Sequence, residues 1–161
     1  IRTLIWQDDE VAPVAVFQIA HGVAEHIDRY DHFARFLASK GFIVCGNDHI
    51  GHGKSVSSPE DLGFTAEKDG YRRFVDDMHI LYSIIHKRFP ELPYFLFGHS
   101  MGSLCARVYA STFSSDLLKY ARKDIVVVLK SNLSKYNKAR LLFYSLMPHL
   151  YLLFYYLKIQ L

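Results

Sequence analysis

The sequence predicts an α/β fold in which a mostly parallel sheet is covered by helices on both faces. Short apolar runs at 14–20, 42–45 and 94–97 are typical of buried strands, and segments with helical periodicity separate them. Strands that alternate with helices of this length indicate right-handed crossovers, which pair the strands in parallel. With 161 residues, half of them hydrophobic, the chain can bury one core.

Turn residues bound the first strand and the first helix. The strand 14–20 closes at His21 and Gly22. Asp28 is a suitable N-cap for the following helix, and Gly41 supplies its C-terminal stop. Between them, apolar residues recur at helical spacing at Tyr30, Phe33, Ala34 and Leu37.

A second helix and a third strand follow the polar, glycine-rich loop 47–58. Pro90 ends this helix, and the strand 94–97 runs directly into a third helix that extends to about Ser111. The apolar face of the second helix comprises Tyr71, Phe74, Val75, Met78, Tyr82, Ile85 and Phe89.

The composition changes abruptly near Ser114. Residues 1–114 carry 11 Lys/Arg against 14 Asp/Glu, whereas the remaining residues carry 8 against 2 and contain no glycine. We therefore divide the chain into 1–113, the α/β unit, and 114–161, an atypical basic tail rich in Leu, Tyr and Lys. The tail is interpreted as a lid or as an out-of-frame segment.

Two features of the tail bear on its structure. Residues 125–129 form a candidate strand. Residues 141–157 carry no formal charge, and their length is near the lower limit of about 17–25 residues for a membrane span. Pro148 and His149 interrupt this stretch, so a lid or surface helix is the preferred interpretation and membrane association the weaker one.

Composition also narrows the class of protein. The positive charge lies in the tail without a recognition motif, so nucleic-acid binding is not expected. Cys45 and Cys105 are too few for a disulfide framework and are expected as buried thiols in a reducing cytoplasm. The chain begins at Ile1 rather than at a methionine, so its start is interpreted as missing or trimmed. It shows no signal peptide, so a cytoplasmic location is expected, with peripheral membrane attachment as the alternative.

The most informative motif is Gly98-His99-Ser100-Met101-Gly102, at the junction of a predicted strand and a predicted helix. A strand-to-helix turn this sharp points the serine hydroxyl outward, and the two glycines keep neighbouring side chains away. The backbone N–H after the serine can then stabilise an oxyanion. The motif predicts a nucleophilic serine.

Four segments together resemble one family in their order and spacing. They are HGVAEHIDRY at 21–30, NDHIGHGKS at 47–55, the helix with Asp76-Asp77, and GHSMG at 98–102. The group they resemble is the α/β-hydrolase group that contains monoacylglycerol lipases, lysophospholipase-like hydrolases and the serine aminopeptidase S33-type domain. The resemblance spans about residues 12–113 and implies the α/β-hydrolase fold, truncated after the nucleophile elbow.

The resemblance also implies roles for individual residues. Ser100 matches the catalytic nucleophile, and the backbone N–H groups of Val23 and Met101 match the oxyanion hole. Ser103 stands where the group often has glycine, a small departure that still permits close packing. The supporting residues are His21 and Gly22 in the oxyanion loop and Gly98, His99 and Gly102 in the elbow. No metal and no cofactor are implied.

Other interpretations of these loops are weaker. Gly53-Lys54-Ser55 matches the end of a phosphate-binding loop, but that motif requires glycine where Asp48 stands. Asp48 is instead expected to organise its loop, Asp76 and Asp77 to be solvated or to brace a loop, and His99 to pack under the elbow. Metal binding is disfavoured because no carboxylate or cysteine joins the loop histidines at ligand spacing. The histidines expected to converge and brace the oxyanion loop are His21, His26, His49 and His52.

No base and acid for Ser100 are identifiable. Both should follow the serine in this fold, and the candidates are Asp116, Asp124 and His149. Asp124 begins a candidate strand, whereas a triad acid belongs at a carboxyl end. The resemblance thus implies hydrolysis of an acyl ester or lipid monoester through an acyl-enzyme, impaired by truncation. A non-catalytic remnant and an S33-type aminopeptidase are the alternatives, and the oligomeric state is not predicted.

Overall fold

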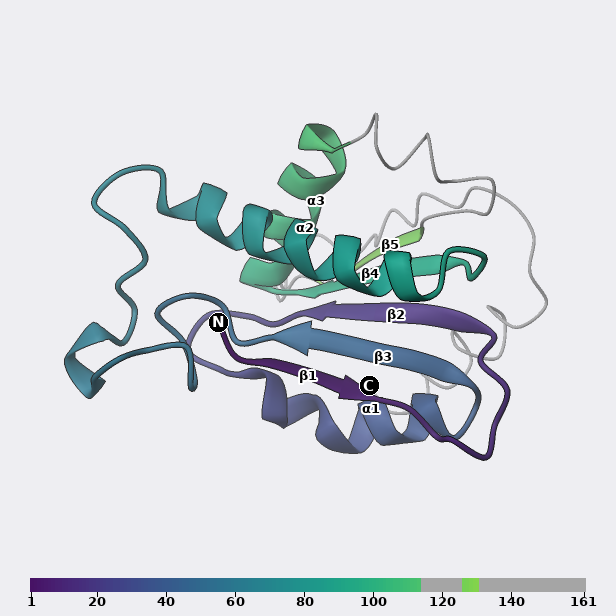
Figure 1. Ribbon diagram of the computed structural model, residues 1–161. Coiled ribbons are helices and arrows are strands. Elements are labelled where there is room, and N and C mark those ends of the chain that lie inside the picture. Colours follow the sequence, from purple (N-terminus) through teal and green to yellow (C-terminus); the bar gives the residue numbers. More distant parts are fainter. Residues whose placement is uncertain (114–125, 131–161) are drawn as a thin grey trace.

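A computed structural model of the chain describes residues 1–113 and 126–130 (Figure 1). These residues form a five-stranded sheet in the order β1-β3-β2-β4-β5. β2 pairs in parallel with β3 and with β4, β4 pairs in parallel with β5, and β1 runs antiparallel to β3. The predicted mostly parallel sheet is confirmed. The strands are β1 (Thr3–Trp6), β2 (Ala15–Ala20), β3 (Phe42–Asn47), β4 (Tyr94–His99) and β5 (Val126–Lys130).

Helices cover both faces of this sheet, as predicted. In Figure 1, α1 (Asp31–Ala38) lies on one face, and α2 (Gly70–Arg88) and α3 (Met101–Thr112) lie on the other. Two 3₁₀ turns, η1 (Ile27–Tyr30) and η2 (Pro59–Asp61), lie in the loops that follow β2 and β3.

The strands alternate between two apolar cores. On β4, Tyr94 and Leu96 belong to the core beneath α2 and α3, whereas Phe95 and Phe97 belong to the core beneath α1. β2 is buried along its whole length. Because both faces are covered, the central strands are mainly apolar on both sides, which is the pattern that predicted them, and Gln18 is a buried polar residue within β2.

The two cysteines are buried and form no disulfide. Burial raises the pKa of Cys45 to about 12 and that of Cys105 to about 11, so both thiols stay protonated at neutral pH. They therefore act as small apolar side chains of the core.

Two local expectations differ from the structure, and one strand was not predicted. Asp28 is not an N-cap: η1 precedes α1, and the Asp28 carboxylate instead accepts two hydrogen bonds from the Arg2 guanidinium, at 2.6 and 2.7 Å. Tyr71 is 53% exposed, because it lies in the first turn of α2, ahead of Phe74, the first buried residue of that helix. β1 is a strand that sequence periodicity does not reveal.

Candidate active site

The candidate site lies where β2, β3 and β4 end, at one edge of the sheet. The loop 21–26 follows β2, the loop 48–58 follows β3, and Ser100 follows β4. Carboxyl ends of neighbouring parallel strands meet at a common edge, where ligands bind in open α/β sheets. A Cβ atom built on Gly22 would lie 3.2 Å from the Cβ of Ser100, so the backbone of the first loop packs against the serine.

Ser100 forms the turn between β4 and α3 in a strained conformation. Its φ of 52° and ψ of −116° lie in a region that L-residues rarely adopt. Such a residue costs on the order of 1–3 kcal/mol and persists only where its surroundings impose it. Here the Ser103 hydroxyl and the Ser103 N–H both donate to the Ser100 carbonyl, at 2.6 and 2.9 Å. The small residue at 103 thus fits the turn.

The two glycines of the elbow lack room for a side chain. A Cβ atom on Gly98 would lie 2.5 Å from the carbonyl oxygen of Gly102. A Cβ atom on Gly102 would overlap the carbonyl oxygen of Ala20, at the end of β2. Glycine at 98 therefore lets the end of β4 lie close to the start of α3, and glycine at 102 lets α3 lie against the end of β2.

His21 controls the peptide plane that carries the Val23 N–H. Its Nδ1 donates to the carbonyl oxygen of Gly22 at 2.7 Å, and its Nε2 accepts from the His49 N–H at 2.9 Å. Acceptance at Nε2 requires the neutral imidazole, and burial lowers the pKa of His21, which favours that form. In a trans peptide the C=O and N–H point in opposite directions. Holding the Gly22 carbonyl therefore fixes the direction of the Val23 N–H.

Three of the four loop histidines lie together. The ring centroids of His21 and His49 are 4.3 Å apart, and those of His21 and His52 are 5.5 Å apart. His26 lies elsewhere: its partly exposed ring has Nδ1 3.5 Å from Asp28 Oδ2. Within the described part of the chain, no group of three His, Cys, Asp or Glu side chains could hold a metal ion.

His49, like His21, is fully buried in this histidine cluster. Burial lowers the pKa of His49 to about 3, and its ring packs 5.1 Å from that of Phe74. Among the described residues, neither of its ring nitrogens has a hydrogen-bond partner. His49 is therefore a neutral ring whose contacts are mainly packing contacts.

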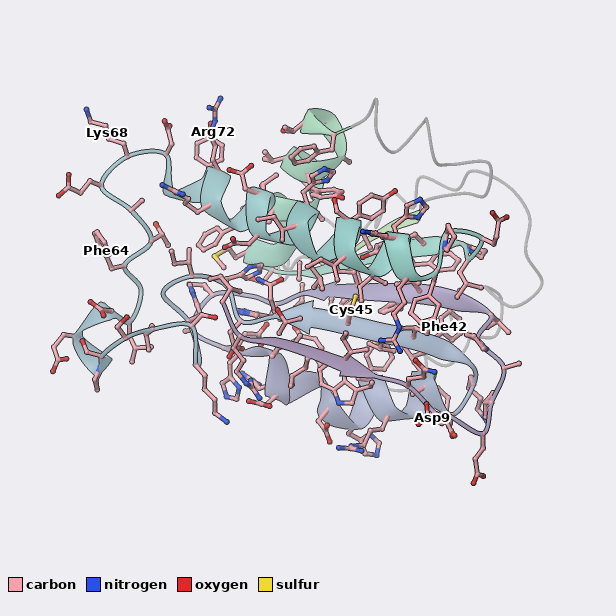
Figure 2. All side chains as sticks on the ribbon, in the orientation of Figure 1. Asp9, Phe42, Cys45, Phe64, Lys68 and Arg72 are labelled. Atoms are coloured by element: carbon pink, nitrogen blue, oxygen red, sulfur yellow. The ribbon has the colours of Figure 1, made fainter. Side chains whose placement is uncertain are left out.

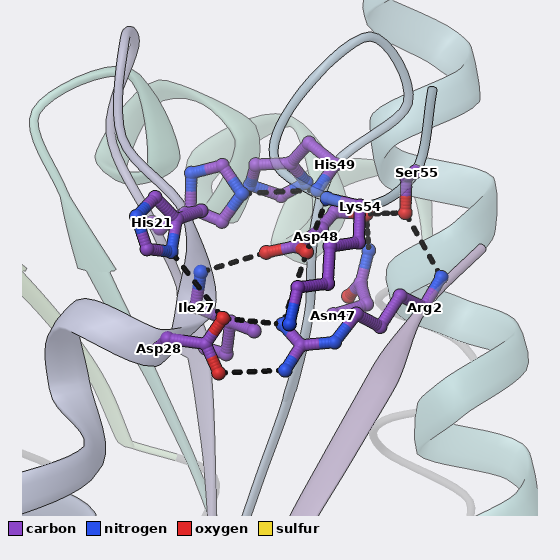
Figure 3. A network of polar contacts seen from close by, with 10 residues as sticks. Arg2, His21, Ile27, Asp28, Asn47, Asp48, His49, Lys54 and Ser55 are labelled. Carbon is purple, nitrogen blue, oxygen red and sulfur yellow. Dashed lines mark hydrogen bonds and ion pairs between the residues drawn. The ribbon is translucent and has the colours of Figure 1, made fainter. Parts of the chain in front are cut away.

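Asp48 organises the second loop, as expected (Figure 3). Its carboxylate accepts from the N–H groups of Ile27 and Lys54, at 2.8 and 2.9 Å, and from Arg2 at 3.2 Å. Burial would raise the pKa of Asp48, but these bonds lower it overall. Because the Lys54 amide is bound to a carboxylate, it is not available to cradle a phosphate. Arg2 also pairs with Asp28, so one cation links β1 to both loops.

Glu25 bridges the loop after β2 and the turn at Ser100, a contact that sequence reasoning missed. Its Oε1 accepts from the N–H of Gly22, from the Tyr30 hydroxyl at 2.8 Å and from His99 Nδ1 at 3.0 Å. The Glu25 side chain is 8% exposed. The His99 side chain, 25% exposed, thus has Glu25 as its hydrogen-bond partner, which the expectation for His99 did not include.

Apolar side chains are exposed at the same edge of the sheet. Val23 is 62% exposed beside Gly22, and Leu62 and Phe64 are 59% and 58% exposed on the loop that precedes α2. Figure 2 shows Phe64 pointing away from the ribbon of this loop. The carbonyl of Gly51 accepts from the Gly63 N–H at 2.7 Å, which ties this loop to the one after β3.

The candidates for a base and an acid, Asp116, Asp124 and His149, lie outside the described residues, as does the apolar stretch 141–157. Along α2, Asp76 is exposed and Asp77 is half-buried. In the ranges 1–113 and 126–130, the structure contains no helix long and apolar enough to span a membrane.

Comparison with known proteins gives a family match over most of the chain. The model of the family described as serine aminopeptidase, S33, matches residues 11–157. A monoglyceride lipase of Rattus norvegicus is 37% identical over 90 residues, which cover 56% of this chain and 28% of that protein. A monoacylglycerol lipase of Mycolicibacterium smegmatis is 34% identical over 112 residues, which cover 70% of this chain and 38% of that protein.

Solved structures agree with this match. A thermostable carboxyl esterase from Bacillus coagulans superposes with a TM-score of 0.65 at 38% identity, covering 70% of this chain and 36% of that one. A monoacylglycerol lipase of Paleococcus ferrophilus superposes with a TM-score of 0.53 at 30% identity, covering 70% and 38%. The chain therefore spans between 28% and 38% of the length of these four relatives.

Proposed function

Because the chain belongs to the serine aminopeptidase S33 family of α/β hydrolases, we propose that it contributes the nucleophile of a carboxylic ester hydrolase. The Ser100 Oγ bonds to the ester carbonyl carbon, the ester C–O bond breaks, and the serine proton ends on the departing alcohol, which leaves an acyl-enzyme. Water then attacks the acyl group, releases the carboxylic acid and restores the serine. The strained turn of Ser100 against Gly22 is the observation that carries this proposal.

Two backbone N–H groups are the proposed oxyanion donors. Met101 is the first residue of α3, and the first N–H groups of a helix have no intrahelical acceptor. They also lie at the positive end of the helix dipole, which favours a developing negative charge. The second donor is Val23, whose N–H direction depends on the His21 bond to Gly22. One donor comes from the start of α3 and the other from the loop after β2, so their relative position matters to the reaction.

The proposed substrate is a lipid monoester, such as a monoacylglycerol. The two sequence relatives named above are monoacylglycerol lipases, and exposed apolar side chains lie at the same edge of the sheet as Ser100. An acyl chain could lie along Val23, Leu62 and Phe64, and burial of such apolar surface contributes roughly 25 cal/mol per Å². Aminopeptidase activity is the second candidate, and the name of the family model is what favours it.

Turnover by the 161-residue chain is expected to be weak. A serine hydroxyl needs a base and an orienting acid, and after Ser100 the sequence offers only Asp116, Asp124 and His149. A reagent that reacts once with the serine is therefore a sharper probe than product formation. A fluorophosphonate is such a reagent, since it traps the nucleophile in a tetrahedral, oxyanion-like adduct.

The test compares the full chain with Ser100→Ala and with Ser111→Ala. Ser111 is an exposed serine on the same helix, which makes it the matched control. Labelling that is lost only in Ser100→Ala supports the proposal. The substrate class is assigned by comparing hydrolysis rates: faster hydrolysis of nitrophenyl butyrate or a monoacylglycerol than of an alanine nitroanilide indicates an ester hydrolase. The reverse preference would favour the aminopeptidase. A folded chain without any labelling would overturn the hydrolase proposal in favour of a non-catalytic protein.

A further inference from the structure

We propose that Glu25 is a positioning residue whose carboxylate ties the Gly22 amide to the His99 ring and so sets the oxyanion loop against Ser100. This inference rests on the function proposed above, and none of the roles implied by the motifs includes Glu25. The carboxylate does not touch the reacting atoms. It acts through the loop backbone on one side and through the elbow on the other.

The geometry around Gly22 shows why this contact matters. A Cβ atom on Gly22 would lie 2.8 Å from Glu25 Oε1, 3.2 Å from His99 Nδ1 and 3.2 Å from Ser100 Cβ. The Gly22 backbone thus sits between the carboxylate, the ring and the nucleophilic residue. If the carboxylate were removed, the loop could move away from Ser100 along this direction.

Side chains must hold this loop because sheet pairing ends before it. The last ladder pair between β2 and β4 joins Ala20 to Gly98. Beyond it, Glu25 accepts the Gly22 N–H, and His21 donates to the Gly22 carbonyl. The peptide planes on both sides of Gly22 are therefore fixed by two different side chains.

The charge of Glu25 strengthens the bridge. A single carboxylate oxygen accepts three donors, and hydrogen bonds to a charged acceptor are roughly twice as strong as neutral ones. Burial would raise the pKa of Glu25, but the bonds from His99, Gly22 and Tyr30 lower it overall, so the carboxylate stays ionised at neutral pH. A glutamine retains one acceptor of similar shape without the charge and should keep part of the effect.

The experiment compares Glu25→Ala and Glu25→Gln with Arg29→Gln in the full chain. Arg29 is the matched control: it pairs with the other carboxylate oxygen at 3.5 Å, and its side chain is 63% exposed. Fluorophosphonate labelling of Ser100 should slow on the order of 100-fold in Glu25→Ala, since a misplacement of about 1 Å costs that much. It should slow less in Glu25→Gln and remain unchanged in Arg29→Gln, all at a temperature where each variant is folded.

NMR gives a second readout that does not require labelling. The His99 Nδ1–H resonance and slow exchange of the Gly22 amide should be present in the wild-type chain and in Arg29→Gln. Both should be lost in Glu25→Ala and weakened in Glu25→Gln. Absence of labelling in the wild-type chain would contradict the proposed function. It would also contradict the positioning role, even if the NMR signals show that the Glu25 bridge is present. Labelling of Glu25→Ala within about twofold of wild type, or unchanged NMR signals in both Glu25 variants, would overturn the positioning role alone.

Discussion

Acidification from about pH 7 to about pH 5 should weaken the folded chain through His49. Its side chain is fully buried, and burial lowers its pKa to about 3. In the unfolded chain the same imidazole has an ordinary pKa of about 6.5 and takes up a proton at pH 5. The unfolded state then binds more protons than the folded state, so the free energy of unfolding falls as the pH falls through 6.5.

The two pKa values set the size of the effect. Between about pH 7 and pH 5 they predict a loss of about 2 kcal/mol from His49. His21 adds to the loss in the same direction, because burial lowers its pKa as well. Carboxylates with lowered pKa values, such as Asp48 and Glu25, keep their full contribution above about pH 4.5. Burial raises the pKa of Asp77, which acts in the opposite direction on acidification, so the loss from His49 is read as the difference between wild type and a variant without this histidine.

Urea unfolding at the two pH values measures this loss, with Trp6, the one tryptophan, as the fluorescent probe. His49→Leu should lose about 2 kcal/mol less than wild type on acidification, because leucine cannot titrate. His32→Leu, which removes an exposed histidine from α1, is the matched control. Equal losses in wild type and His49→Leu would refute the reasoning.

Three further predictions concern the elbow and the ion-pair network. Ser100→Gly should raise the free energy of unfolding by about 1 kcal/mol in urea titrations, because glycine relieves the positive φ, and it should abolish labelling. Gly102→Ala should lower that free energy by about 3 kcal/mol, since a Cβ atom would overlap the Ala20 carbonyl; a stable variant would contradict this packing. Arg2→Ala should cost about 2 kcal/mol in thermal unfolding, because it leaves the buried Asp48 carboxylate without its cation, and an unchanged Tm would count against the network.

Sequence periodicity was sufficient to predict the elements that bury a complete face in the core. β2 is buried along its length and apolar except for Gln18, and the stripe through Phe74, Met78 and Ile85 predicted the buried face of α2. β1 gave no such signal, because only Trp6 of its four residues is buried. Asp28 was misread because capping is local, whereas its partner Arg2 lies far away in the chain and no spacing rule connects them.

The same difference between local motifs and contacts of distant residues applies to the candidate site. The elbow is a local motif, so Ser100 and its glycines were predicted from their spacing alone. The bond between Glu25 and His99 joins residues 74 positions apart and has no local signature. One signal was present for Glu25: it lies three residues after Gly22, the spacing at which a carboxylate reaches back to a backbone N–H in a capping box.

The central place of β2 also governs when the site assembles. Val16 pairs with Ile43 in β3 and with Tyr94 in β4, so the second pairing must close a much longer stretch of chain. Closing a longer loop of chain costs more conformational entropy and slows folding. Ser100 reaches Gly22 only when β4 docks, so in a refolding experiment covalent capture of the serine should lag behind the recovery of helical circular dichroism.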